Sequence, residues 1–478
     1  METRSIYDNI SALDHRYSVS DPVLFKELGR YFAESAAVRY CVQVEKALIL
    51  AHMHFQNLDL PEASAALEGI EDRVSPEEVY TEEAKTRHNI RALVNVMMRH
   101  VPESIRHLVH MGTTSVDILD TAQALRIRDG VRHLILPMLC KLENQLCSWA
   151  AQEADTPQVG RTHVQLAVPI TLGYTFAEYV SRLGKSIQEI ERLSRNLAGK
   201  IAGAVGAYNA TSLIYADPMA FEAHTLQLLG LQASEHSTQM VEPEYVLRLL
   251  VEINVAFGII ANLADDLRHL QRSEIDEVRE YFAADQVGSS TMPQKRNPWN
   301  AEHVKSLWKA FFPRVQTFFM DQISEHQRDL SNSASSRFVM DYLTGFTLAV
   351  GRMIKILEGM STRPDGLEGN LRKGGAGVLA EAAYILLSRQ GESEGHEIIR
   401  KLTLKAESEK RPFMEVLRED AAVWSKLESG LAAIGGLPPA EFFADPANYR
   451  GKAAEKSRAL ATRWQSATAA IEAACKES

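Results

Sequence analysis

The residues best suited to chemistry lie in one stretch, Gly288-Ser289-Ser290-Thr291-Met292-Pro293-Gln294-Lys295-Arg296-Asn297-Pro298. Gly288 permits unusual backbone dihedrals, and the three hydroxyl residues after it supply hydrogen-bond donors and a candidate base. Asn297 followed by Pro298 predicts a helix N-cap with proline at the first helical position. Lys295 then lies just ahead of a helix N-terminus, where free N–H groups and the helix dipole favour anions. The pattern predicts an anion site beside a row of hydroxyls.

The same residues also suit a simpler interpretation, in which a solvated loop only caps a helix. A phosphate-binding P-loop is excluded, because the Gly-Lys-Ser/Thr ending is missing. Two further blocks are rich in polar side chains. They are His110-Met111-Gly112-Thr113-Thr114-Ser115, followed by Asp117 and Asp120-Thr121-Ala122, and Gly160-Arg161-Thr162-His163-Val164-Gln165-Leu166-Ala167.

The composition of the 478 residues is that of an ordinary globular protein, with a formal net charge of −10. A nucleic-acid or membrane-surface protein would favour a basic excess. The four cysteines have no metal-ligand spacing and form no disulfide framework, which indicates a reducing compartment. The first residues contain no apolar signal core, and no run approaches the roughly 18 apolar residues of a membrane span. We therefore expect a cytoplasmic protein, and no fingerprint of a metal site or cofactor is present.

Long helical periodicity dominates the middle of the chain. Apolar residues recur every three or four positions through residues 172–197, 246–270 and 332–357, and two more helix-like stretches span 116–152 and 298–322. A helix of 30 residues is about 45 Å long. The pattern therefore predicts an all-α protein with an elongated central bundle of long helices.

Residues 251–261 are apolar on nearly all sides of their helix. Such a helix must be buried all round, which predicts an oligomer whose subunits pack through the bundle. The alternative is a central helix inside a monomeric bundle.

The ends of the chain differ from the middle. Residues 1–112 contain shorter helical pieces broken by prolines, and a glycine cluster at 366–377 reads as a boundary. We predict an N-terminal helical domain at 1–112, a central long-helix bundle at 113–364 and a C-terminal helical domain at 365–478.

The stretch at 288–298 resembles the signature loop of the fumarase/aspartase superfamily nearly residue for residue, and both polar blocks occur in the order expected for that family. The resemblance covers most of the chain. It implies a three-domain, all-α fold, a homotetramer with a twenty-helix core, and active sites built from three subunits. It also implies β-elimination with release of fumarate, and no cofactor or metal ion.

The resemblance also implies roles for individual residues. Ser289 matches the general base, and His163 matches the general acid that protonates the leaving nitrogen. Glu302 matches the glutamate that orients this histidine. His88 matches a second active-site histidine, although the family often has Asp where this chain has Asn89. The positions that match carboxylate-binding groups are Thr114, Ser115, Lys295 and Asn297.

Other features resemble the family members that cleave succinylated purine nucleotides. Arg16 and Tyr17 resemble a pair that contacts the nucleotide phosphate, and Gln239 matches a substrate-binding glutamine. A second phosphate cluster is matched by Arg328, Ser333 and Arg337. The expected partner is therefore a small-molecule, succinylated purine nucleotide, with no nucleic acid and no membrane.

Some residues depart from this pattern. The loop carries Gln294, which argininosuccinate lyases often have, and His303 occupies a position where some relatives place arginine or another polar residue. Argininosuccinate lyase and 3-carboxy-cis,cis-muconate cycloisomerase thus remain alternatives, although the cycloisomerase needs no phosphate cluster. A non-catalytic, crystallin-like structural protein is a further alternative. It is disfavoured because Ser289, Lys295, Asn297 and His163 are all present.

Overall fold

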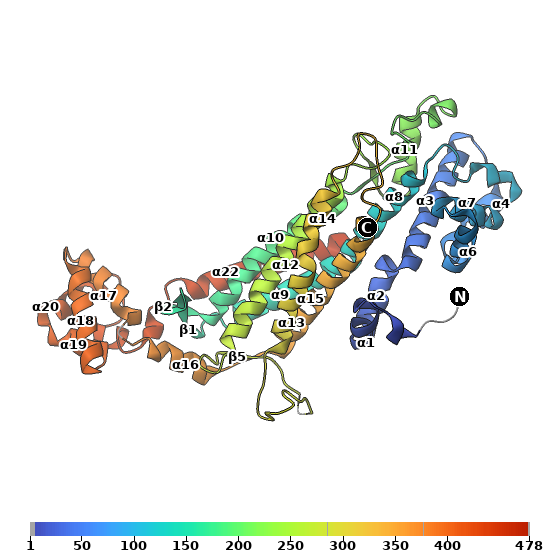
Figure 1. The fold of residues 1–478 in the computed structure, drawn as a ribbon. Helices are drawn as coiled ribbons and strands as arrows, with labels where there is room; N and C mark the ends of the chain where they lie inside the picture. Colours follow the sequence, from blue (N-terminus) through green and yellow to red (C-terminus); the bar gives the residue numbers. More distant parts are fainter. Residues whose placement is uncertain (1–4, 284, 376, 477–478) are drawn as a thin grey trace.

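The computed structural model describes residues 5–283, 285–375 and 377–476, and helices account for most of them. The predicted all-α class is confirmed. The molecule is elongated, with a bundle of long helices in the middle and smaller helical units towards each end (Figure 1).

The central bundle consists of the rods that the apolar periodicity predicts. Residues 115–152 form one continuous rod, because a π-helical turn joins two α-helices without a break. The last helix of the chain also belongs to the bundle, packed against α9 and α10. The elements are α8 (Ser115–Gly130), η4 (Val131–Ile135), α9 (Leu136–Gln152), α10 (Leu172–Arg195), α12 (Glu244–Leu270), α13 (Trp299–Phe311), η6 (Phe312–Arg314), α14 (Val315–Met320), η7 (Ser335–Phe338), α15 (Val339–Gly359) and α22 (Ala453–Lys476).

Most of α12 is buried within the bundle. Ile253, Phe257 and Ile260 have no exposed surface, whereas Val255 on the same helix is 48% exposed. The expectation that no stretch of the chain resembles a membrane span is wrong for α12, because its length and hydropathy would suffice for one. In its most apolar 18-residue window 61% is buried inside the protein, so the pattern is that of a core helix.

Shorter helices pack beside one end of the bundle, chiefly through contacts of α3 and α2 with α8, and α11 packs on α3. They are η1 (Ile6–Asp8), η2 (Leu13–Tyr17), α1 (Ser18–Ser20), α2 (Pro22–Phe32), α3 (Glu34–Phe55), α4 (Pro61–Leu67), α5 (Ile70–Arg73), α6 (Pro76–Thr86), α7 (Asn89–His100), η3 (Glu103–Leu108), η5 (Thr211–Leu213) and α11 (Pro218–Gln227).

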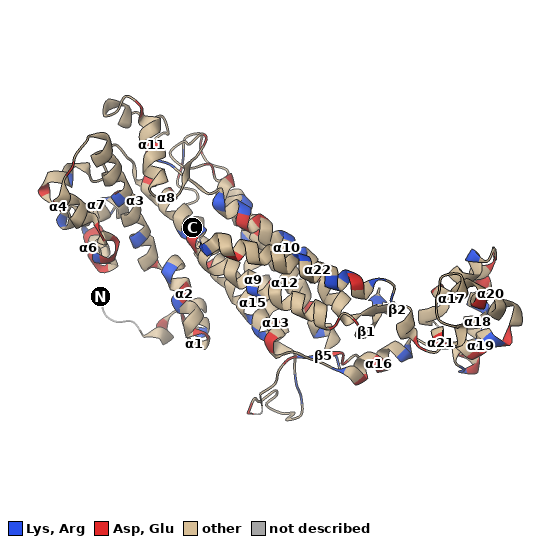
Figure 2. Ribbon diagram, turned by 180° about the vertical axis from the view of Figure 1, so that it is seen from behind, with Lys and Arg blue, Asp and Glu red and all other residues tan. Residues whose placement is uncertain are grey.

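Helices at the other end form a second hydrophobic core, which includes Leu387, Val416 and Leu427. Basic and acidic residues are interspersed along the helices of this unit (Figure 2). After it, α22 returns to the bundle, where the ring of Trp464 packs so closely on Gly184 that a Cβ there would lie 2.4 Å from it. The elements before α22 are α16 (Pro364–Lys373), α17 (Gly377–Arg389), α18 (Gly395–Glu409), α19 (Phe413–Glu419), α20 (Ala421–Ala432), α21 (Pro439–Phe442) and η8 (Pro446–Asn448).

The strands of the described residues form three two-stranded sheets. The longest pair is an antiparallel hairpin whose register shifts between Val159 and Arg161. The others are a parallel pair, β3 with β4, and an antiparallel pair, β5 with β6. The strands are β1 (Pro157–Thr162), β2 (Gln165–Thr171), β3 (Ala198–Gly199), β4 (Gln232–Ala233), β5 (Val278–Arg279) and β6 (Ser361–Thr362).

One buried charge-bearing group in the bundle lacks a partner. Glu143 on α9 is fully buried, and neither carboxyl oxygen accepts a hydrogen bond. Burial raises the pKa of Glu143 well above its usual range, because the interior disfavours the ionised form. The folded protein therefore holds a proton here that the unfolded chain releases above about pH 4.5.

We predict that Glu143→Met raises the free energy of unfolding by about 1–3 kcal/mol at pH 8, because it removes an unpaired buried polar group. Since the folded-state pKa is raised, the wild-type protein loses stability as the pH rises, so the gain should shrink towards pH 4. Urea unfolding at both pH values measures this. Glu428→Met, at an exposed position on α20, is the control. Equal stability of wild type and Glu143→Met at pH 8 would contradict the prediction.

Candidate active site

A cavity of about 490 Å³ brings together five of the predicted site residues, a volume within the range of small-molecule sites. It lies where the first half of α8 meets the segment before α12, the segment after α14, and η7. The predicted residues in its wall are His88, Ser115, Arg328, Ser333 and Arg337. They come from three separate parts of the sequence, so the fold gathers groups that the sequence could only pair by resemblance.

The cavity wall is rich in hydrogen-bond donors. Ser115 is the first residue of α8, where backbone N–H groups are free and the helix dipole is positive. Arg328 donates a long hydrogen bond, 3.5 Å, from Nη2 to Asn332 Oδ1, while its buried Nε has no partner. A buried guanidinium donor without an acceptor is poised for an anion.

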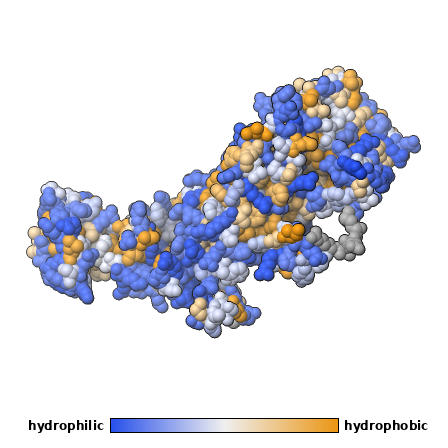
Figure 3. Space-filling model, in the orientation of Figure 1, coloured by the Kyte–Doolittle hydropathy of each residue, from blue (hydrophilic) through white to orange (hydrophobic). Residues whose placement is uncertain are grey.

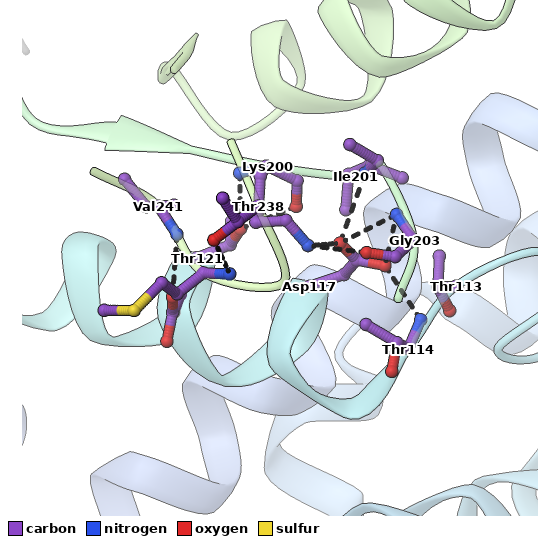
Figure 4. A network of polar contacts seen from close by, with 12 residues as sticks. Thr113, Thr114, Asp117, Thr121, Lys200, Ile201, Gly203, Thr238 and Val241 are labelled. Atoms are coloured by element: carbon purple, nitrogen blue, oxygen red, sulfur yellow. Dashed lines mark hydrogen bonds and ion pairs between the residues drawn. The ribbon is translucent and has the colours of Figure 1, made fainter. Parts of the chain in front are cut away.

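The start of α8 is fixed by a buried carboxylate, Asp117, which lies at the centre of Figure 4. Asp117 and Lys200 form an ion pair with no exposed side-chain surface on either residue. The same carboxylate accepts the backbone N–H of Thr114 at 2.8 Å and that of Gly203 at 3.1 Å. Lys200 Nζ also donates to Gly203 O at 3.1 Å. The network locks the first turn of α8 to the segment after β3.

His88 of the cavity wall and the predicted residue Gln239 are both held in place by hydrogen bonds that involve backbone groups. His88 is the N-cap of α7, and its Nδ1 accepts the backbone N–H of Arg91 at 3.2 Å. Because Nδ1 is the acceptor, Nε2 is left to donate or to take part in proton transfer. The backbone N–H of Gln239 donates to Gln327 O at 3.3 Å, which ties the segment before α12 to the one that carries Arg328.

The loop at 288–298 closes on itself. Ser289 Oγ accepts the backbone N–H groups of Thr291 and Met292 at 3.3 and 3.1 Å. Gly288 is required, because a Cβ there would lie 2.0 Å from Lys295 O. Two donors thus already point at Ser289 Oγ and favour negative charge on it.

The predicted helix cap of this loop is wrong. α13 begins at Trp299 with Pro298 as its N-cap, and the Asn297 side chain instead donates to Gly288 O at 3.0 Å. The carboxylate of Glu280 takes the capping role, because it accepts the backbone N–H groups of Asn300 and Ala301 at 3.3 and 3.0 Å. Asn297 therefore closes the loop.

His163 lies at the exposed tip of the β1–β2 hairpin. His163 and Val164 occupy the two turn positions with φ of 52° and 59°, as a tight turn of this hand requires. This conformation is strained for the β-branched Val164, whose side chain is 93% exposed. The base of the hairpin is firm, because Gln158 donates to the fully buried Glu277 at 2.7 Å, and Arg161 nearer the tip donates to the same carboxylate at 3.1 Å.

Arg16, Tyr17 and Glu302 lie around the start of α13. The Tyr17 hydroxyl is 3.0 Å from His303 Nε2, and Glu302 is exposed in the first turn of α13. Burial lowers the pKa of His303, and the nearby charges of Arg352 and Arg16 lower it further. His303 is therefore neutral at physiological pH and can share a proton with the Tyr17 hydroxyl.

The predicted residues thus form three groups within one chain. The cavity lies at the α8 end of the bundle, the loop at 288–298 hangs below the start of α13, and the hairpin lies further along (Figure 1). Across residues 5–283, 285–375 and 377–476, no hydrogen bond or ion pair joins His163 to Ser289 or Glu302. In the same ranges no group of three or more His, Cys, Asp or Glu could hold a metal ion.

Eight polar residues of the cavity wall have no role predicted from the sequence, and they are Asn89, Asp120, Gln123, Arg126, Glu242, Asp321, Asn332 and Ser336. Asp120 lies in a block that was noted, five residues after Ser115 on the same helix. Gln123 lies two steps of i to i+4 after Ser115, through Leu119, and this helical spacing could have placed Gln123 on the face that carries Ser115. No signal in the sequence indicates that the segments at 239–247 and 328–339 cover that face.

Comparisons with known proteins identify the family to which the chain belongs. A family model described as "Lyase" matches residues 15–309, and one described as "Adenylosuccinate lyase C-terminal" matches residues 324–438. The chain therefore belongs to this lyase family, within the fumarase/aspartase superfamily, and is a C–N lyase. Its relatives include the adenylosuccinate lyases of Pyrococcus abyssi and Pyrococcus horikoshii, which are 33% and 32% identical to it. Both alignments span 93% of this chain and 96% of the relative.

A solved structure shares the fold. The 3-carboxy-cis,cis-muconate lactonizing enzyme from Pseudomonas putida superposes with a TM-score of 0.78 at 25% identity, and the match covers 93% of this chain and 97% of that one. The predicted fumarase/aspartase-like fold is thereby confirmed.

We predict that Lys200→Met lowers the free energy of unfolding by about 3–5 kcal/mol, because it leaves the Asp117 carboxylate buried without its counter-charge. Urea unfolding measures the loss. Lys185→Met, at an exposed position on α10, is the matched control and should change stability by less than about 0.5 kcal/mol. A loss below about 1 kcal/mol for Lys200→Met would show that the backbone N–H groups alone satisfy Asp117.

Proposed function

We propose that the chain cleaves adenylosuccinate into AMP and fumarate, and cleaves the related imidazole nucleotide SAICAR into AICAR and fumarate in the same way. The observation that carries the proposal is the cavity, which holds Arg328, Ser333 and Arg337 together with the start of α8. Two guanidinium groups and a hydroxyl suit a phosphate, and the free N–H groups of a helix N-terminus suit a carboxylate. The family and the two Pyrococcus relatives support the same activity.

In the proposed mechanism, Ser289 removes a proton from the succinyl carbon next to a carboxylate. The C–N bond breaks, its electron pair leaves with the nitrogen, and His163 donates a proton to that nitrogen. The electrons of the broken C–H bond form the double bond of fumarate. Two backbone N–H groups already donate to Ser289 Oγ, which favours the ionised hydroxyl that this role needs. Lys295 adds positive charge for the negative intermediate.

The complete site requires more than one chain in this proposal, since the base and the acid lie on separate groups within a single chain. A homotetramer with sites shared between subunits would bring the groups together. Val255 is an exposed apolar residue on α12, most of which is buried, and apolar residues gather over the central bundle (Figure 3). An apolar surface of this kind on a bundle of long helices suits packing against other copies. A cytoplasmic enzyme is in keeping with its four free cysteines.

The competing activities differ in whether their substrates carry a phosphate group. A cycloisomerase that acts on carboxymuconate, like the structural relative, has no use for the cluster of Arg328, Ser333 and Arg337. Turnover of adenylosuccinate, followed by ultraviolet absorbance, tests the proposal directly. Turnover of argininosuccinate or carboxymuconate in its place would overturn it.

We predict that Ser289→Ala lowers kcat for adenylosuccinate by roughly 10²–10⁴-fold, because the general base is lost, while KM changes little. Steady-state kinetics measure both constants. Ser290→Ala is the matched control, since it removes the neighbouring hydroxyl. A Ser289→Ala variant as active as the wild type would exclude Ser289 as the base.

We predict that mixing Ser289→Ala with His163→Ala, each nearly inactive alone, restores activity after the subunits exchange. If a site takes its serine and its histidine from different chains, random mixing leaves about a quarter of the sites intact. Native mass spectrometry confirms that mixed oligomers form. Mixed oligomers without recovered activity would show that both residues come from the same chain.

A further inference from the structure

One acceptor stands out in a cavity otherwise rich in donors. Asp120 lines the wall, and its Oδ2 accepts the backbone N–H of Val241 at 3.0 Å. Among the described residues no donor reaches its Oδ1. The other two carboxylates of the wall are each held by a serine hydroxyl, since Glu242 accepts from Ser234 at 2.8 Å and Asp321 accepts from Ser335 at 2.6 Å.

The charges around Asp120 keep it ionised at neutral pH. Burial raises its pKa to about 6, while the Val241 N–H and the charges of Arg328 and Lys200 act in the opposite direction. Asp117 on the same helix adds a smaller upward shift. Above pH 7 the Asp120 side chain is thus chiefly an acceptor without a proton of its own.

An ionised carboxylate in an anion site repels the anion unless the ligand also brings a donor. The ligand that fits must therefore combine an anionic group for Arg328 and Arg337 with a hydrogen-bond donor a few bonds away. A ribonucleotide meets this need, because its sugar hydroxyls lie near the phosphate. Apolar side chains such as Leu247, Leu250 and Phe318 complete the wall and suit the flat purine ring.

We propose that Asp120 is a specificity-determining residue, which accepts a hydrogen bond from the 2′- or 3′-hydroxyl of the ribose through its free Oδ1. The proposal rests on the proposed function in so far as the ligand is a purine nucleotide. It adds that the enzyme selects ribonucleotides over deoxyribonucleotides, and it assigns that selection to one side chain. Carboxylates read ribose hydroxyls in other nucleotide sites for the same reason, since an ionised oxygen is a strong acceptor.

The test compares the binding of AMP, 2′-deoxy-AMP and 3′-deoxy-AMP at pH 7.5 by calorimetry. The wild-type protein should bind AMP about tenfold or more tightly than at least one of the deoxy forms, because a hydrogen bond to a charged acceptor is lost. Asp120→Ala should weaken AMP binding and bring this ratio close to one. Asp321→Ala should keep the ratio, because that carboxylate is already engaged by Ser335.

A supporting role for Asp120 predicts a different result. If Asp120 only holds Arg328 in place, Asp120→Ala weakens all three ligands equally and the ratio persists, which would overturn the proposal. A wild-type protein that binds all three nucleotides alike would overturn it too. If Asp120→Ala does not fold, Asp120→Asn replaces it, since an amide oxygen is a weaker acceptor. The ratio should then fall several-fold, and an unchanged ratio counts against the proposal.

The same measurements separate this proposal from the function on which it rests. Wild-type protein that cleaves adenylosuccinate without any preference for the ribose hydroxyls would leave the function intact and remove the role of Asp120. Protein that neither binds AMP nor cleaves adenylosuccinate would remove both.

Discussion

The buried ion pair of Asp117 and Lys200 is the interaction on which the cavity depends. Neither side chain is exposed, so both charges are removed from water at a large cost. That cost is offset because backbone N–H groups of Thr114 and Gly203 also donate to the carboxylate. The first turn of α8 is thereby fixed to the segment after β3, and the direction of the helix N-terminus is set before any ligand arrives.

A second constraint comes from the length of the helices. Long rods can pack tightly only along their sides, so the irregular segments that carry reactive groups collect where the rods end. The hairpin with His163 and the loop with Ser289 both follow this rule. The hairpin tolerates a strained Val164 because its base is pinned to Glu277, which is fully buried and also binds the side chain of Asn370 at 2.8 Å.

The helices were predictable because burial of one face imposes a repeat that can be counted in the sequence. The rods at α8–α9, α10, α12 and α15 lie where the apolar periodicity places them. Local details of the turns and helix caps were less predictable. The hairpin escaped notice because its turn, His163-Val164, lacks the Asn-Gly or Asp-Gly pair that marks such turns. The cap at Asn297 was mistaken because its side chain bonds to Gly288, nine residues earlier, an acceptor that only the folded loop presents.

The sequence by itself determined the helical class, the family, and the residue types that carry the chemistry, because periodicity and motifs are local properties. Tertiary structure alone decided which of those residues share a cavity. Arg328 and His88 are 240 positions apart, and their meeting depends on how α7, α8 and the segment after α14 pack. It also decided the state of Asp120, since the burial of a carboxyl and the absence of a donor at one of its oxygens are properties of the surroundings and not of the residue.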